Sequence, residues 1–227
     1  MAKTRLGIMV GEASGALGAT VFSHNRYGTY VRLRAVPVQP NSEYQLNAKE
    51  TLTKYSQAWS ALTDAQRKSW STWAATNPII DNLGDKRILT GHVAFIMLNA
   101  RLRQDEDPQI SIPPITAPPT ALTSMTPTYT AATDLLSIAF APSPLGENNA
   151  LYIWVAVVES TSRKYVKNLY KRLGVTSKNT TTPYEADSVP LRFGDVQVGQ
   201  IVHVKIAVLD RVSGLISQPR AASVAAT

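Results

Sequence analysis

The side chains that most often carry out chemistry are few and scattered in this sequence. The three histidines are His24, His92 and His203, and none has a second histidine at HxH or HxxxH spacing. The chain contains no cysteine, so it offers neither a thiolate nucleophile nor a disulfide frame. A zinc site would therefore need distant carboxylates, and we expect no metal.

Three short motifs resemble known sites without completing one. Gly11, Gly15 and Gly18 are spaced like a glycine-rich loop, but no Lys-Ser/Thr pair follows them. The run 105–107 is acidic but lacks the alternating ligands and the glycine of a calcium loop. Ser14 has no Gly-x-Ser-x-Gly context. We therefore expect a protein that is not an enzyme and that binds no cofactor.

Charge is divided unevenly along the 227 residues. Residues 1–104 contain 13 Lys and Arg against 6 Asp and Glu, whereas residues 105–227 contain 10 of each. The whole net charge of +7 thus lies in the first half. Such an excess favours an acidic partner, either protein or nucleic acid, although a solvated basic surface explains the whole-chain charge equally well.

The rest of the composition is that of a soluble globular protein, 44% apolar and 17% charged. Met1 is followed by Ala-Lys-Thr-Arg, without the apolar segment of a secretory signal. No run approaches the roughly 18 apolar residues of a membrane span. We expect no membrane partner and synthesis in a cytoplasm.

Residues 1–40 are predicted to form an extended Gly/Arg-rich arm with a β-hairpin. If residues 26–34 are extended, alternate side chains share a face. One face then carries Arg26, Tyr30, Arg32 and Arg34, and the other carries Tyr27, Val31 and Leu33. We expect the first face to bind carboxylates or phosphates of a partner, while the second packs on the host domain. A solvated basic strand is the alternative.

Glycines are frequent in the same arm. Gly15 and Gly18, together with Gly11 and Gly28, would let the backbone approach a partner closely. A flexible leader followed by a turn explains them equally well. We include Gly15 and Gly18 among the predicted partner-binding residues.

Residues 41–104 show helical periodicity and are predicted to form a three-helix anchoring domain. Ser42 with Gln45 and Thr63 with Gln66 are spaced as capping boxes, and a third helix begins at Thr90 or Gly91. The helical spacing of the tryptophans favours core packing over a carbohydrate- or base-stacking platform. These tryptophans are Trp59, Trp70 and Trp73.

Residues 105–119 are predicted to form a Pro-rich, semi-rigid linker. Residues 120–227 alternate with a period of two and are predicted to form an antiparallel β-sandwich. In it, Trp154 is expected to face inward and Leu215–Ser217 to form the last strand. The Ala-rich tail that follows is expected to be mobile. The fold class is therefore α+β multidomain.

Residues 120–220 resemble a fibronectin type III-like or related immunoglobulin-like sandwich. The segment Leu135–Phe140 corresponds to strand B and Tyr152–Val158 to strand C, while Val196–Val208 resembles the approach to strand F. The tyrosine usual at the corner before strand F is missing, with Val202 near its place. This fold implies no particular function.

Residues 7–104 resemble the N-terminal region of uncharacterised proteins encoded by tailed bacteriophages. The resemblance rests on the Gly/Ser leader and on a set of segments in the same order. These are Phe22–Arg32, Pro37–Pro40, Gln57–Gln66, Trp70, Trp73, Leu83-Gly84 and Gly91-His92. It implies a virion structural protein and supplies no catalytic residue.

Together these features predict a structural virion protein that is made in the host bacterial cytoplasm and is oligomeric in the assembly. We expect a head accessory or decoration (cement) protein that binds acidic surfaces of other virion proteins through its basic half. A neck, tail or baseplate component is the alternative. A nucleic-acid-binding protein is disfavoured because no recognition-helix motif is present. It would contact phosphates through Arg26, Arg32, Arg34, Arg87, Arg101 and Arg103.

Overall fold

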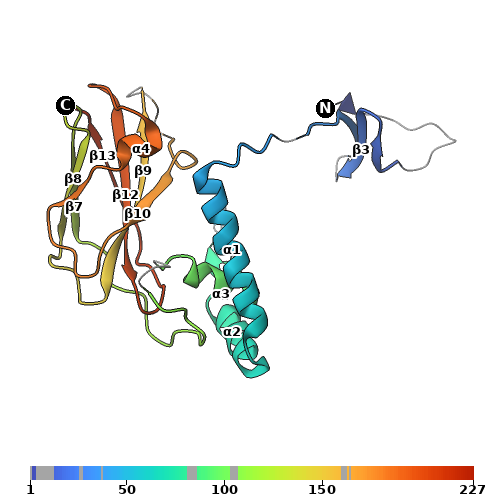
Figure 1. The fold of residues 1–227 in the computed structure, drawn as a ribbon, viewed down its shortest axis with the longest axis horizontal. Coiled ribbons are helices and arrows are strands. Elements are labelled where there is room, and N and C mark those ends of the chain that lie inside the picture. The colour runs from blue at the N-terminus through green and yellow to red at the C-terminus, as the bar shows by residue number, and fades with distance from the viewer. Residues whose placement is uncertain are drawn as a thin grey trace. The chain divides into compact units, whose positions relative to one another are not determined.

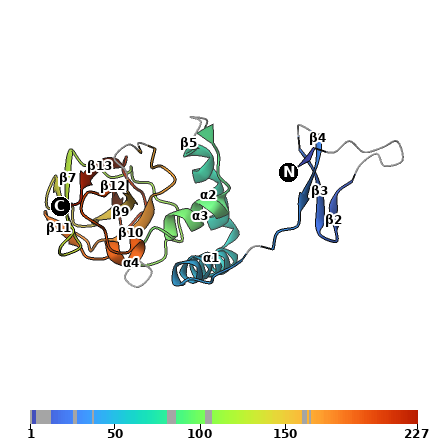
Figure 2. The same cartoon turned by 90° about the horizontal axis from the view of Figure 1, so that it is seen from above.

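The computed structural model describes residues 2–3, 13–25, 28–36, 38–80, 86–102, 107–159, 163 and 165–227. The protein is mixed α+β, and its sheets are antiparallel. Its internal contacts separate two compact units, Met1–Asn47 and Ala48–Thr227 (Figures 1 and 2). The sequence predicts four parts, namely an arm, helices, a linker and a sandwich, and this division stays a prediction. The internal contacts place the helices, the linker and the sandwich mostly in one unit, Ala48–Thr227.

The first unit contains one four-stranded sheet in the order β1-β4-β3-β2. Its strands are β1 (Ala2–Lys3), β2 (Gly15–Leu17), β3 (Thr20–Asn25) and β4 (Gly28–Leu33). The hairpin expected in the arm corresponds to β3 and β4, whose register pairs Phe22 with Val31. Two further short strands extend this hairpin on either side.

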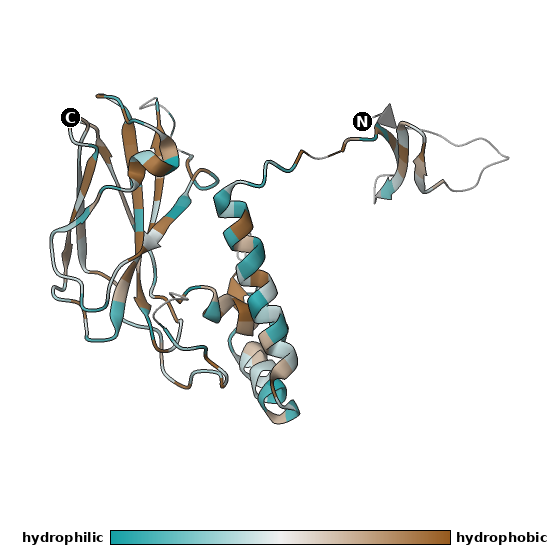
Figure 3. Cartoon of the chain, viewed as in Figure 1, coloured by the Kyte–Doolittle hydropathy of each residue, from teal (hydrophilic) through white to brown (hydrophobic). Residues whose placement is uncertain are grey.

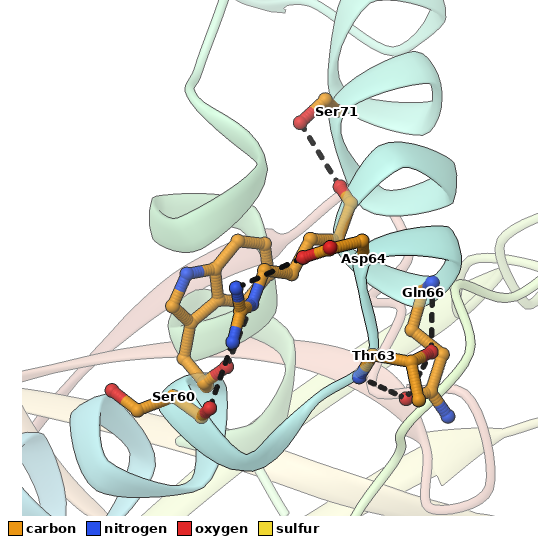
Figure 4. A network of polar contacts seen from close by, with 7 residues as sticks. Ser60, Thr63, Asp64, Gln66 and Ser71 are labelled. Carbon is orange, nitrogen blue, oxygen red and sulfur yellow. Dashed lines mark hydrogen bonds and ion pairs between the residues drawn. The ribbon is translucent and has the colours of Figure 1, made fainter.

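Three helices follow, as the periodicity predicts: α1 (Glu43–Ala61), α2 (Asp64–Thr76) and α3 (Gly91–Asn99). The capping box at the start of α2 is formed. Thr63 Oγ1 accepts from the Gln66 amide at 3.3 Å, and Gln66 Oε1 accepts from the Thr63 amide at 2.9 Å (Figure 4). Arg67 Nη2 donates to Ser60 O at 2.7 Å, which ties the end of α1 to α2. The pair β5 (Ile79–Ile80) and β6 (Lys86–Arg87) lies between α2 and α3.

The helices share an apolar core centred on Trp70, which is 0% exposed. Its ring centroid lies 5.5 Å from that of Phe95 in an edge-to-face contact. Gly91 permits a close crossing of α2 and α3, because a Cβ atom there would lie 2.8 Å from the Ser71 amide nitrogen. The core role expected for Trp70 is therefore confirmed.

Two antiparallel sheets in residues 124–225 enclose a second apolar core, to which both contribute side chains. In Figure 3, hydrophobic (brown) stretches run along the strands of both sheets. One sheet has the order β11-β8-β7 and the other β10-β9-β12-β13. The elements are β7 (Ser124–Thr130), β8 (Leu135–Ala141), β9 (Asn149–Val158), β10 (Lys171–Val175), β11 (Tyr184–Ala186), α4 (Val189–Phe193), β12 (Ile201–Asp210) and β13 (Arg220–Ala225).

The segments expected to be strands B, C and F lie in β8, β9 and β12. Strands β9 and β12 pair directly over ten residues, and β8 belongs to the other sheet. An immunoglobulin-like sandwich separates B from C and F in this way. The arrangement therefore follows the pattern on which the resemblance rests.

Three expectations for the sandwich are wrong. Trp154 faces away from the core, since Ile153 and Val155 beside it point inward and β9 is apolar on both faces. The last strand is β13, whereas Ile216 makes only an isolated bridge to Leu209. The tail expected to be mobile pairs with β12 instead, and Ala226 is buried in the core. Strand pairing and burial there outweigh the weak β-propensity of alanine.

The Pro-rich segment is bound to the helices over its first residues. Trp70 Nε1 donates to Ser111 O at 3.0 Å. Asn99 bonds both backbone groups of Ile110, accepting from its amide at 2.8 Å and donating to its carbonyl at 3.2 Å. Residues 110–111 therefore form part of the packed helical layer and are not a free spacer.

A buried ion pair joins this segment to the sandwich. Arg211 Nε donates to Asp107 Oδ2 at 2.8 Å, and the two side chains are 1% and 0% exposed. Lys178 Nζ lies 3.6 Å from Asp107 Oδ1. Burial, and secondly the charge of Asp107, raises the pKa of Tyr55 on α1. The carboxylate thus interacts with both the sandwich and the helices.

The turn before β13 contacts the end of α3. Arg101 Nη1 donates to Gly214 O at 3.2 Å. Gly214 has a φ of +70°, and a Cβ atom there would lie 2.6 Å from Leu98 O. The helices and the sandwich therefore pack as one body at this turn.

Replacing Asp107 with Asn should remove the buried negative charge to which the Arg211 guanidinium donates. We expect a loss of about 3 kcal/mol in unfolding free energy, measured by urea denaturation. Asp64→Asn is the control, because it removes an ion pair whose carboxylate is 99% exposed and should change little. Equal effects of the two variants would contradict the role given to Asp107.

Replacing Gly214 with Ala tests the contact with α3. Gly199→Ala is the matched control, since Gly199 has a φ of +89° but no atom within 4 Å of where a Cβ would lie. The control should lose about 1 kcal/mol from backbone strain alone. Gly214→Ala should lose clearly more in the same thermal melts, because it also overlaps a carbonyl oxygen. Equal losses would show that the contact contributes nothing.

Candidate interaction surface

The sheet of the first unit presents two chemically different faces. Residues opposite one another in antiparallel strands point to the same side, and so do alternate residues within a strand. Tyr30 and Arg32 on β4 therefore share a face with their partners on β3, Ser23 and Val21. Arg32 is exposed and Tyr30 is half-buried. We call this side the cationic arm face.

The structure brings some of the predicted partner-binding residues together. Arg34 follows β4 directly, has an exposed side chain, and its backbone amide donates to Ala19 O at 2.8 Å. Arg26 lies outside the described residues, as does Tyr27. Three of the four side chains expected on one face are thus found in or beside β4, and their binding role stays a prediction.

The backbone conformation at positions 15 and 18 favours glycine. Their φ angles are +108° and +60°, a region that other residues rarely adopt. Gly18 lies in the turn between β2 and β3, and no atom lies within 4 Å of where a Cβ would be at either position. The positive φ angles account for both residues, and close approach of a partner stays a prediction.

The opposite side of the sheet is apolar. Register places Leu17, Phe22, Val31 and Leu33 on one side, and we call it the apolar arm face. Leu17 is 75% exposed and Leu33 is 80% exposed. Sequence reasoning identified Val31 and Leu33 but missed Leu17 and Phe22. The alternation of Thr20, Phe22 and His24 was the signal that could have added Phe22.

The described strands of this unit enclose no buried side chain. Among the described residues, none before Tyr55 is buried. A sheet gains stability by burying an apolar face against a second layer. The two outer strands, β1 and β2, span only two and three residues. Their short edges leave the faces as the main surfaces for a partner.

The histidines remain apart in the fold. His24 is on β3, His92 is on α3 beside Trp59, and His203 is on β12, where burial lowers its pKa. Within the described ranges, no three His, Asp or Glu side chains gather as metal ligands. A search of the same ranges for a helix long and apolar enough to span a bilayer finds none.

The tryptophan of α2 that is not fully buried lines a groove. Trp73 is half-buried, and the groove has a volume of about 570 Å³ between α2 and the Pro-rich segment. Its walls carry side chains without charge. They are Ser69, Thr72, Trp73, Thr76, Asn77, Pro113, Pro114, Ile115 and Thr116. The platform alternative considered for the tryptophans thus has a physical counterpart at Trp73.

Cations cover the aromatic residues on the outer side of β9. The Arg172 guanidinium lies 4.8 Å from the Tyr152 ring centre. The Lys205 ammonium lies 5.0 Å from the centre of Trp154 and 5.7 Å from that of Tyr170. These cation–π contacts cover the rings on this side, and they explain why Trp154 is tolerated outside the core.

Comparison with known proteins adds little beyond the fold. No family model matches the chain, and no curated protein does. Similar solved structures include a family 76 glycoside hydrolase from a bovine Bacteroides thetaiotaomicron strain, with a TM-score of 0.34, 11% identity, and coverage of 48% of this chain and 20% of that one. The FN1–FN3 domains of chicken CNTN1 match with a TM-score of 0.33 and 11% identity, and the match covers 48% of this chain and 32% of that one. An Fn3-like protein from Clostridium thermocellum matches with a TM-score of 0.26 and 15% identity, and the match covers 46% of this chain and 92% of that one.

This chain therefore spans a small part of the first two structures. All three TM-scores are below 0.5, so no argument about activity or partners rests on them. The structural neighbours include fibronectin type III-like domains.

Proposed function

We propose that this chain is a non-enzymatic structural protein of a tailed bacteriophage virion, and specifically a head accessory or decoration protein. Its arm attaches to an acidic surface of another virion protein, and its fibronectin type III-like sandwich projects from the particle. The observation that carries this proposal is the arm sheet, which has two distinct faces and no buried residue among those described. Such a sheet is suited to fold against a partner.

Charge supports an acidic partner for the cationic arm face. Arg32 and Arg34 are exposed, and neither forms a side-chain ion pair within the part of the chain that the structure describes. Guanidinium groups form bidentate hydrogen bonds with carboxylates, which adds geometric specificity to attraction. Attachment through such pairs weakens with salt unless they become well desolvated.

Nucleic acid is less well supported as the partner. Arg101, one of the arginines assigned to phosphates in that alternative, donates to Gly214 O, and burial lowers its pKa. It is engaged in holding the helices to the sandwich. Two others, Arg26 and Arg103, lie outside the described residues.

The test is rebinding of the purified chain to particles assembled without it. Reversing Arg32 and Arg34 to Glu should weaken cosedimentation about tenfold or more, because attraction becomes like-charge repulsion. Lys68→Glu, an exposed reversal on α2, is the control and should rebind normally. Rebinding of the control should fall with rising salt.

Mass spectrometry of intact particles tests the location. A copy number matching the shell supports a head protein, whereas the copies of a single ring indicate the neck, tail or baseplate. Absence of the chain from purified particles would contradict the proposal in every form.

A further inference from the structure

We propose that the groove between α2 and the Pro-rich segment is a binding site for a neutral saccharide. The site lies within the second unit, goes beyond the attachment role proposed for the arm and does not depend on it. Its volume of about 570 Å³ falls within the range of about 300–1,000 Å³ that small-molecule sites occupy. One wall follows α2 and its C-cap from Ser69 to Asn77, and the other runs from Pro113 to Thr116.

Trp73 supplies the apolar surface on which the C–H groups of a sugar ring can pack. Its side chain is half-buried, and its ring centroid lies 6.0 Å from that of the fully buried Trp70 at an interplanar angle of 67°. Trp70 in turn donates from Nε1 to Ser111 O at 3.0 Å, just before the facing wall. The indole and the facing wall are therefore held by the same packed core. A rigid aromatic platform loses little conformational freedom when a ligand binds.

The polar groups of the helical wall are mainly hydrogen-bond acceptors. Three hydroxyl groups of α2 each donate their proton to a backbone carbonyl oxygen three or four residues earlier. They are Ser69 Oγ, bonded to Gln66 O at 2.7 Å, Thr72 Oγ1, bonded to Lys68 O at 3.1 Å, and Thr76 Oγ1, bonded to Trp73 O at 3.0 Å. A hydroxyl oxygen used in this way can still accept. Asn77 Nδ2 donates to Trp73 O at 2.9 Å and to Thr76 Oγ1 at 3.1 Å, so its carbonyl oxygen is the atom left for a ligand.

The facing wall strengthens this excess of acceptors. Pro113 and Pro114 have no amide proton, so they add ring methylenes and carbonyl oxygens but no donor. A matching ligand must therefore donate several hydrogen bonds and also present an apolar face to Trp73. A sugar ring has both properties, because its hydroxyl groups donate and its C–H groups form an apolar patch.

The same features disfavour the other ligand classes. The described lining residues carry no charged side chain, so a phosphate or carboxylate would find no cation there. A cationic ligand would contact Trp73, but it would find no carboxylate and would meet a chain of net charge +7. A proline-rich peptide brings carbonyl oxygens and few N–H groups, so it would set acceptors against acceptors.

The indole N–H signals in NMR spectra of the isotope-labelled full-length chain test this site. The chain has four tryptophans, and Trp73→Phe identifies the signal of Trp73. The probes are three soluble neutral polysaccharides, a glucan, a mannan and a galactan. Titration with at least one of them should shift the Trp73 signal in a saturable way. The signal of Trp154, which lies on the sandwich strand β9, should stay in place.

One hydroxyl group offers a matched pair of variants for the same titration. Thr72→Val removes an acceptor with little change of shape and should raise the dissociation constant about fivefold, as expected for one lost hydrogen bond. Thr53→Val is the control, because Thr53 Oγ1 makes the same kind of bond on α1, to Lys49 O at 2.9 Å, and Thr53 does not line the groove. The control should bind like the original chain.

An oligoproline peptide and an oligodeoxynucleotide serve as competing probes. A Trp73 shift with either of them, and with no polysaccharide, would overturn the inference. Absence of any Trp73 shift with the three polysaccharides would overturn it too, as would equal affinities of Thr72→Val and Thr53→Val. None of these results bears on attachment to particles, because Arg32 and Arg34 are not lining residues of the groove.

Discussion

An isolated layer of β-sheet has no interior, and this constraint governs the first unit of the protein. Ordering each residue costs about 1–2 kcal/mol of conformational entropy, which apolar burial must offset. The arm pairs its strands in good register, yet its exposed leucines bury little surface within the chain. In the proposed function, the partner supplies the burial that the described strands lack. Alternation along β4 then determines what each face can bind, since Arg32 and Leu33 are neighbours in sequence and lie on opposite sides.

In the second unit, by contrast, the helices and the sandwich pack against one another and bury each other's surface. Asp107 and Arg211 are buried together, and Gly214 lets the sandwich turn approach Leu98 closely. A buried charge pair stabilises little in net terms, but losing one partner is costly. The pair therefore specifies how the Pro-rich segment docks. A projecting sandwich attached in this way would move with the helical layer and not independently of it.

Sequence patterns predicted the helices well because their signals are local. The Thr63–Gln66 box, the end of α2 before Pro78 and the start of α3 at Thr90 each depend on residues within one turn. The sandwich was harder. Trp154 was placed inside because β9 is apolar on both faces, and only pairing with Lys205 on β12 shows which side is outer. Strand β13 was missed because alanine and serine carry little β-propensity, and its place depends on the distant β12.

For the arm, the sequence predicted the hairpin and the alternation of Arg32 and Leu33 but not the shape of the unit. The strands β1 and β2 are too short to show a period, so the four-stranded sheet could not be anticipated. The lack of a buried side chain among the described arm residues is a property of the assembled strands, visible only in three dimensions.

Hydrogen exchange at the amides of β3 and β4 tests most directly whether the arm depends on a partner. Amides at hydrogen-bonded positions of the β3–β4 ladder, such as those of Val21 and Arg32, should exchange almost as fast as in an unfolded chain when the protein is dilute and alone. They should become protected when the chain binds particles, while the amides of β9 and β12 remain protected throughout. Strong and equal protection of β3 and β4 in the dilute, unbound monomer would contradict the account, because the arm would then be stable without a partner.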